Sequence, residues 1–78
     1  MKSKTRPTKY VVCVKNRGFA ASLELRKVYR VVPDDAAEAR RLLRVIDESG
    51  EDYLYPRAYF VSVDVPVAAA RAISAATR

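Results

Sequence analysis

The sequence contains no histidine and no tryptophan, and it has one cysteine and two glycines in 78 residues. Without histidine the chain lacks the commonest general base near neutral pH, so Cys13 has no imidazole to activate it as a nucleophile. Cys13 also has no second cysteine for a disulfide, which predicts a small hydrophobic core residue in a reducing, cytoplasmic setting. The sequence therefore argues against an enzyme and indicates no catalytic, metal-binding or cofactor-binding residue.

Long apolar runs are missing too. The longest uncharged stretch near the end, Val65–Ala70, stops at Arg71 and is far too short to span a bilayer. Residues 1–9 are basic and polar and lack the apolar segment of a signal peptide. A chain of 78 residues forms one domain with a thin core, so we expect shallow sites and no enclosed cofactor pocket. These features predict a cytoplasmic protein without a membrane segment or a cofactor.

Positive charge is distributed unevenly along the chain, whose formal net charge is +6. Residues 1–9 carry +4, and residues 66–78 carry +2. Between Tyr10 and Val65, nine basic side chains balance nine acidic ones. We therefore divide the chain into a flexible basic arm at residues 1–9, a domain at residues 10–65 and a C-terminal helix or tail at residues 66–78.

Several short runs are rich in β-branched and aromatic residues and end at turn residues or proline, as is typical of strands. The clearest are Tyr10–Lys15, Lys27–Val32 and Phe60–Val65. Residues 34–38 place an Asp at a possible helix N-cap with a Glu three residues later, which predicts a helical turn near residues 35–40. After Pro66 the chain is rich in alanine, which predicts a short helix with an apolar side formed by Val67, Ala70 and Ile73.

The middle of the chain fits two structures. Apolar residues recur there at helical spacing, which favours a helix at residues 35–48 in an α+β fold. In the alternative, residues 42–47 form a strand, residues 48–51 a tight turn and residues 52–55 the partner strand. We favour the hairpin because its β-branched and aromatic residues suit strands, and because the order of elements then matches a known fold.

With this hairpin, the order of elements over residues 10–65 resembles the Src-homology-3 (SH3-like) family of small β-barrels. Ser22–Val31 is similar to the diverging turn and the following strand of that family. Tyr55–Phe60 is similar to its closing pattern of apolar residue, proline, two small or polar residues and tyrosine, which forms one helical turn. The resemblance implies a mainly β fold, a small five-stranded SH3-like barrel with a helical turn near residues 35–40 and a short C-terminal helix.

Two phrases are also similar to a group of short, uncharacterised bacterial proteins without an assigned activity. They are Ala21–Leu25 and Arg44–Pro56, together with the Val-Pro sequence that starts the tail. This second resemblance implies a fold rather than a role.

Tyrosine is unusually frequent, with five residues in the chain, and Tyr53, Tyr55 and Tyr59 lie close to Pro56. The SH3 resemblance places Pro56 and Tyr59 in an aromatic groove for proline-rich segments. The chain departs from that pattern, because no tryptophan follows the hairpin and the first loop carries Arg17 instead of an acidic cluster. We therefore predict a protein-interaction or regulatory module with a Tyr-rich surface at Tyr53, Tyr55, Pro56 and Tyr59, whose protein partner has no readable identity. Alternatively, these rings fill the interior and rim of a small barrel.

Two further functions are compatible with the sequence. In the first, an RNA- or DNA-binding accessory protein holds phosphates, and its affinity falls steeply with salt. The contacts in that case are Lys2, Lys4, Arg6, Lys9, Arg40, Arg41 and Arg44. In the second, the C-terminal helix buries its apolar side against a second copy of the chain, which makes the protein self-associating.

Overall fold

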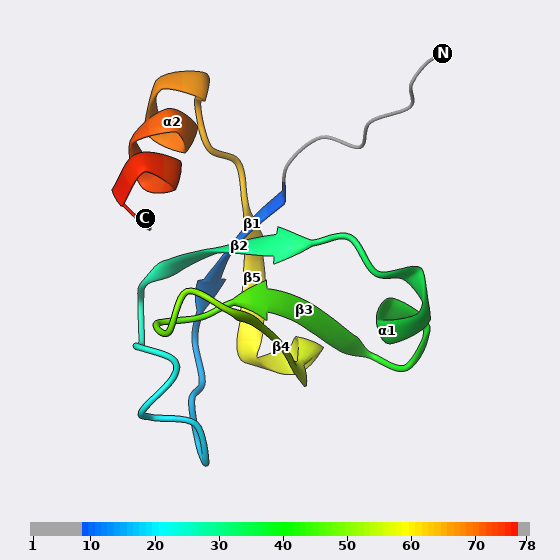
Figure 1. Ribbon diagram of the computed structural model, residues 1–78. Coiled ribbons are helices and arrows are strands. Elements are labelled where there is room, and N and C mark those ends of the chain that lie inside the picture. Colours follow the sequence, from blue (N-terminus) through cyan, green and yellow to red (C-terminus); the bar gives the residue numbers. More distant parts are fainter. Residues whose placement is uncertain (1–8, 77–78) are drawn as a thin grey trace.

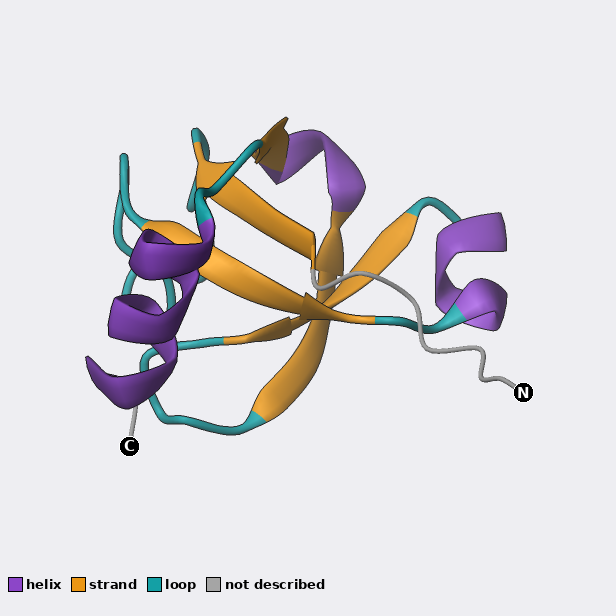
Figure 2. Ribbon diagram, turned by 90° about the horizontal axis from the view of Figure 1, so that it is seen from above, coloured by secondary structure: helices purple, strands orange, loops and turns teal. Residues whose placement is uncertain are grey.

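The computed structural model describes residues 9–76, which form one antiparallel sheet of five strands and two short helices (Figures 1 and 2). The strands are β1 (Lys9–Cys13), β2 (Val28–Val32), β3 (Leu42–Ile46), β4 (Asp52–Pro56) and β5 (Phe60–Val63). The two helices are α1 (Asp35–Ala39) and α2 (Val67–Ala76), and a single 3-10 turn, η1 (Arg57–Tyr59), lies between β4 and β5. The fold is mainly β, as the sequence predicts.

The strand order in the sheet is β4-β3-β2-β1-β5, and neighbouring strands are antiparallel. β4 and β5 are the two edges, and no strand pairing among residues 9–76 joins them. Figure 2 shows the strands fanning around a common interior, with α1 and α2 at opposite ends. Strands β1 and β5, which are far apart in the sequence, lie side by side, with Val12 opposite Val61.

The β3–β4 hairpin confirms the prediction for this part of the chain. Its register pairs Leu43 with Tyr55 and Val45 with Tyr53. Gly50, in the turn between the strands, has a φ of 86°, a conformation that is unstrained only for glycine. The hairpin thus combines strand-forming residues with a turn residue suited to its position.

The alternative of a helix over residues 35–48 is wrong, because α1 ends at Ala39. Asp34 is the N-cap of α1, and its carboxylate accepts a hydrogen bond from the Ala37 N–H at 3.0 Å. Glu38 therefore lies one position too late for the predicted reciprocal cap. Arg41 then adopts a left-handed φ of 62°, which reverses the chain so that a strand begins at the next residue.

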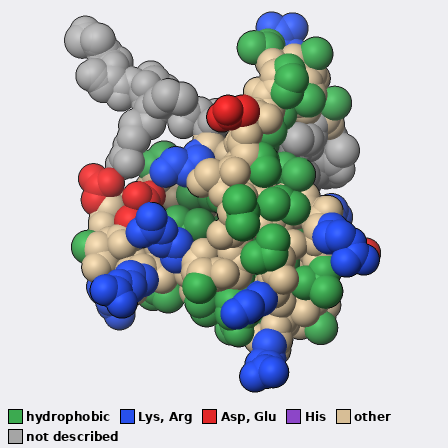
Figure 3. Space-filling view, turned by 180° about the vertical axis from the view of Figure 1, so that it is seen from behind, with side chains coloured by type: hydrophobic (Ala, Val, Ile, Leu, Met, Phe, Trp, Pro, Cys, Tyr) green, Lys and Arg blue, Asp and Glu red, His purple; other side chains and the backbone are tan. Residues whose placement is uncertain are grey.

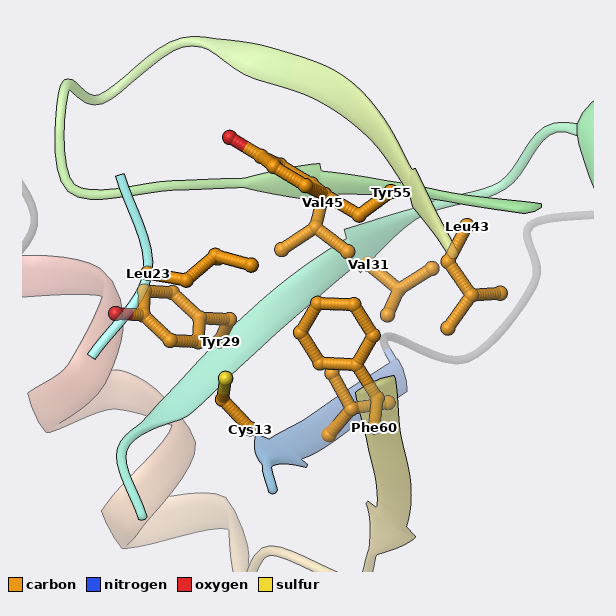
Figure 4. Close-up of a cluster of buried hydrophobic side chains, with 9 residues drawn as sticks. Cys13, Leu23, Tyr29, Val31, Leu43, Val45, Tyr55 and Phe60 are labelled. Carbon is orange, nitrogen blue, oxygen red and sulfur yellow. The ribbon is translucent and has the colours of Figure 1, made fainter. Parts of the chain in front are cut away.

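A single cluster of buried side chains from the strands and the β1–β2 loop forms the core (Figure 4). Its members are Val11, Cys13, Leu23, Tyr29, Val31, Leu43, Val45, Tyr55 and Phe60. Cys13 is fully buried, which confirms its assignment as a core residue. Burial raises the pKa of its thiol, so Cys13 is protonated at neutral pH.

Helix α2 confirms the predicted C-terminal helix, and a hydrogen bond links it to β1. The Tyr10 hydroxyl donates a hydrogen bond to the Ala70 carbonyl oxygen at 3.5 Å, and Tyr10 is buried. Val67 leaves 70% of its surface exposed, whereas the side chain of Ile73 lies outside the described part of the chain. None of the described helices has the length and apolar character needed to cross a membrane.

The N-terminal boundary differs slightly from the predicted one. Strand β1 begins at Lys9, which pairs with Val31 of β2, so Lys9 belongs to the sheet and not to the arm. The remaining arm residues, 1–8, lie outside the described part of the chain.

Candidate protein-binding groove

The four residues predicted to form a Tyr-rich surface lie in different environments. Tyr53 is exposed near the hairpin turn, and Pro56 and Tyr59 are partly buried. Tyr55 is only 3% exposed, because its ring packs edge-on against Phe19 with 5.0 Å between the ring centroids. Tyr55 is therefore a core residue, and its assignment to a binding surface is wrong.

The hydroxyl of Tyr55 stabilises the hairpin. It donates a hydrogen bond to the carboxylate of Asp47, which also accepts bonds from the Ser49 N–H at 2.9 Å and the Ser49 hydroxyl at 2.6 Å. Burial raises the pKa of Asp47, but these hydrogen bonds outweigh burial and hold the pKa below its ordinary value. Burial and the bond to Asp47 raise the pKa of Tyr55. At neutral pH an ionised carboxylate therefore anchors a neutral tyrosine.

The hydroxyl of Tyr29 on β2, two strands away from β4 in the sheet, is also bonded to a carboxylate of the hairpin. This hydroxyl donates to the carboxylate of Glu48 and accepts a hydrogen bond from the Glu24 N–H at 2.7 Å. Glu48 also pairs with the Lys27 ammonium at 2.7 Å, and Lys27 and then Tyr29 lower the pKa of Glu48. The hairpin carboxylates are thus engaged within the fold, and residues 9–76 contain no cluster of three or more side chains that could hold a metal ion.

A groove of about 410 Å³ lies beside Tyr59 and the β1–β2 loop, residues 14–27. Two apolar side chains line it, Val14 and Leu25, and they are 46% and 44% exposed. Lys15 and Arg17 supply positive charge, and neither forms an ion pair with another residue of the described chain. No acidic side chain is among the described residues that line this groove. We call this site the Tyr59 groove.

Hydrogen bonds hold the walls of the Tyr59 groove together. The backbone carbonyl of Tyr59 accepts a hydrogen bond from the Val14 N–H at 2.8 Å. The side-chain hydroxyl of Tyr59 donates a hydrogen bond to the Arg17 carbonyl at 3.0 Å. The side-chain amide of Asn16 donates to the carbonyl of Leu23 at 2.9 Å, and Leu23 is fully buried. The loop is therefore fixed to both η1 and the core, so a ligand meets a preformed surface.

The structure describes only some of the residues predicted to contact nucleic acid. Lys2, Lys4 and Arg6 lie outside the described residues. Arg44 pairs with Asp34 at 2.8 Å and with Asp52 at 3.2 Å, and hydrogen bonds to these carboxylates raise its pKa. Because two carboxylates already neutralise Arg44, this side chain is a poor phosphate ligand.

Other basic side chains come together near the start of β1. Lys9 and Arg57 line one small pocket, and the Arg57 N–H donates to the Arg41 carbonyl at 3.0 Å. Arg40 and Arg41 are exposed. Seen from behind, hydrophobic side chains occupy the middle of the molecule and Lys and Arg side chains surround them at the sides and below (Figure 3). Arg57 belongs to this basic group although the sequence did not indicate it.

Most of the Tyr59 groove was not predicted from the sequence. Val14 ends an apolar run and Leu25 alternates with polar neighbours, so each pattern predicts an ordinary strand residue. The one available signal was Arg17, a cation where the resemblance leads us to expect acidic residues.

Comparisons of the chain with models of protein families, with curated proteins and with solved structures found no match. The chemistry of the Tyr59 groove and of its surroundings is therefore the evidence that bears on function.

Proposed function

We propose that this chain is a non-enzymatic interaction module of the SH3-like type, and that the Tyr59 groove binds an extended, acidic segment of a partner protein. The strand order and the position of η1 between the last two strands support the SH3-like assignment. A single observation carries the binding role. The groove combines exposed apolar side chains with cations that pair with no described residue, and it has no carboxylate among its described lining residues.

The apolar part of the groove supplies affinity. Val14 and Leu25 each expose close to half of their surface, at 46% and 44%. Covering both with a partner side chain contributes about 1–2 kcal/mol. Tyr59 adds an aromatic ring. Hydrogen bonds at its backbone carbonyl and at its side-chain hydroxyl hold this residue in place, so the ring loses little conformational freedom when a ligand packs against it.

The charged part of the groove selects the ligand. Lys15 and Arg17 attract carboxylates, and the planar guanidinium of Arg17 suits paired hydrogen bonds to a carboxylate. A segment with basic residues would be repelled at the same place. The ligand that fits is therefore an extended peptide in which Asp or Glu residues flank an apolar side chain.

Selection from a library of random displayed peptides, with the full chain as the target, tests this proposal. We expect the enriched peptides to be acidic and to share an apolar position. Leu25→Asp should reduce the affinity of a selected peptide at least tenfold, because it places a like charge on the apolar wall. Val61→Asp is the matched control, since Val61 is similarly exposed, at 53%, and does not line the groove.

Three results would contradict the proposal. Binding that survives Leu25→Asp but is lost with Val61→Asp or Tyr53→Ala would locate the site elsewhere. Binding of a random-sequence RNA that falls steeply with salt, together with no enriched peptide, would assign the basic side chains to phosphates. A dimer mass that falls to a monomer when residues 67–78 are removed, again with no enriched peptide, would assign the interaction to self-association through α2.

A further inference from the structure

A second pocket, of about 140 Å³, lies where β1, β3 and β5 meet α1 and η1. No residue that lines it also lines the Tyr59 groove. Its floor and its rim differ in character, because the floor consists of core side chains and the rim of charged and polar ones. The pocket is therefore a separate site with its own chemistry.

The floor is formed by Val11, Leu43 and Phe60, which are buried members of the hydrophobic core. Figure 4 shows Leu43 and Phe60 at the same end of the core cluster, reaching it from strands β3 and β5. These three side chains are at most 8% exposed, so a ligand passes the charged rim before it reaches them.

The rim carries two cations, one carboxylate and one hydroxyl, from Lys9, Arg57, Glu38 and Ser62. Within residues 9–76, neither Lys9 nor Arg57 forms an ion pair. The formal charge of the rim is +1, and the basic neighbour Arg41 lies close by, because its carbonyl accepts the Arg57 N–H at 3.0 Å. This charge favours a ligand with a single negative charge.

We propose that this pocket binds a monocarboxylate with a short apolar tail, either a free acid or the C-terminal residue of a peptide. The tail packs on Leu43 and Phe60, and the carboxylate lies between Lys9 and Arg57. The pocket volume of about 140 Å³ leaves room for a tail of about four to six carbons. Glu38 repels a second negative charge, which disfavours phosphate. This role goes beyond the proposed protein-binding function, because it uses none of the residues of the Tyr59 groove.

A heteronuclear NMR titration of the full chain with isovalerate tests the inference. We expect saturable shifts of the amide signals of Arg57 and Ser62, with a dissociation constant on the order of 1 mM. Isovaleramide, which has no charge, and inorganic phosphate, which has no tail, should each bind at least tenfold more weakly. A Gly-Gly-Leu tripeptide and its C-terminal amide then distinguish the two sources of the carboxylate. Tighter binding of the tripeptide acid than of isovalerate assigns the site to chain ends, and weaker binding assigns it to free acids.

Two variants at the rim should change the affinity for isovalerate in opposite directions. Arg57→Gln should weaken binding about tenfold, because a charge-assisted hydrogen bond is lost. Glu38→Gln should strengthen it a few-fold, because a like charge is removed. The double variant Lys15→Gln/Arg17→Gln is the matched control, since it removes two cations outside the pocket and should leave the affinity unchanged.

The inference fails if isovalerate does not saturate, if phosphate binds equally well, or if the control variant weakens binding as much as Arg57→Gln. The last two results would indicate a general attraction of anions to a basic protein. Failure here is distinguishable from failure of the proposed function, because Leu25→Asp alters only the Tyr59 groove and should not affect isovalerate binding.

Discussion

The β3–β4 hairpin and the start of the β1–β2 loop, residues 14–17, use their charged side chains in opposite ways. In the hairpin, hydroxyls and a lysine hold the carboxylates of Asp47 and Glu48. In the loop, Lys15 and Arg17 line the groove and pair with no described residue. A charge that is paired within the fold attracts a ligand only weakly, whereas an unpaired one at a groove remains available. Under the proposed function, the hairpin carboxylates stabilise the fold, whereas the groove cations bind the ligand.

The largest expected effect is a difference in stability between variants at two leucines of the β1–β2 loop. Leu23 is fully buried in the core, and Leu25 is 44% exposed in the Tyr59 groove. Leu23→Ala should lower the free energy of unfolding by about 3 kcal/mol, because it leaves a cavity, whereas Leu25→Ala should change it by less than about 0.5 kcal/mol. Urea unfolding followed by circular dichroism measures both. Equal losses would mean that the two side chains do not divide into a core residue and a groove residue.

The next effect tests the hairpin. Asp47→Ala should lower the free energy of unfolding by about 2 kcal/mol, because the buried hydroxyl of Tyr55 loses its acceptor. In the Asp47→Ala variant, the further change Tyr55→Phe should lower the free energy of unfolding only slightly more, since the acceptor of the Tyr55 hydroxyl is already absent. A double-mutant cycle on the two residues measures this coupling by urea unfolding. Simple additivity of the two single losses would show that the hydrogen bond does not stabilise the hairpin.

Local patterns predict the elements of this fold well but predict their tertiary contacts poorly. The hairpin follows from strand-forming runs around Gly50, whose φ of 86° suits only glycine. Tyr53 and Tyr55 are two positions apart on β4, so alternation places both on one face of the sheet. The Tyr55 ring packs against Phe19 of the distant β1–β2 loop and against Phe60 of β5, whereas the aromatic contacts of the described chain do not include Tyr53.

The Tyr59 groove shows the same limit. Val14 and Leu25 come from the two ends of the β1–β2 loop and Tyr59 from η1, and a bond from the Val14 N–H to the Tyr59 carbonyl joins the loop to η1. Sequence spacing contains no information on that approach, because it results from the pairing of β1 with β5. The sequence singles out Arg17 as a departure from the SH3-like pattern. Its place in a groove, however, can be recognised only when the positions of the neighbouring apolar side chains are known.

A smaller effect appears when the pH is lowered. The pKa values of Asp47 and Glu48 lie below their ordinary values in the folded protein, so the unfolded chain binds protons more tightly. The stability that these carboxylates contribute is therefore complete above about pH 4.5, and it is lost as the pH falls through the depressed folded values. The urea midpoint should be level from pH 7 to about pH 5 and fall below about pH 4. Glu48→Gln should make this fall shallower, whereas Lys15→Gln/Arg17→Gln should preserve it.

The smallest expected change in stability belongs to the groove cations, and it tests the comparison most directly. Because Lys15 and Arg17 pair with no described residue, the double variant Lys15→Gln/Arg17→Gln should change the free energy of unfolding by less than about 0.5 kcal/mol. Lowering the formal net charge from +6 reduces self-repulsion, so a small gain is the expected direction. The same variant should reduce the affinity for the selected acidic peptide at least tenfold, as measured by calorimetry. A loss of more than about 1 kcal/mol in the free energy of unfolding of the unliganded chain would show that these two charges stabilise the fold. The charges of the loop would then act as those of the hairpin do.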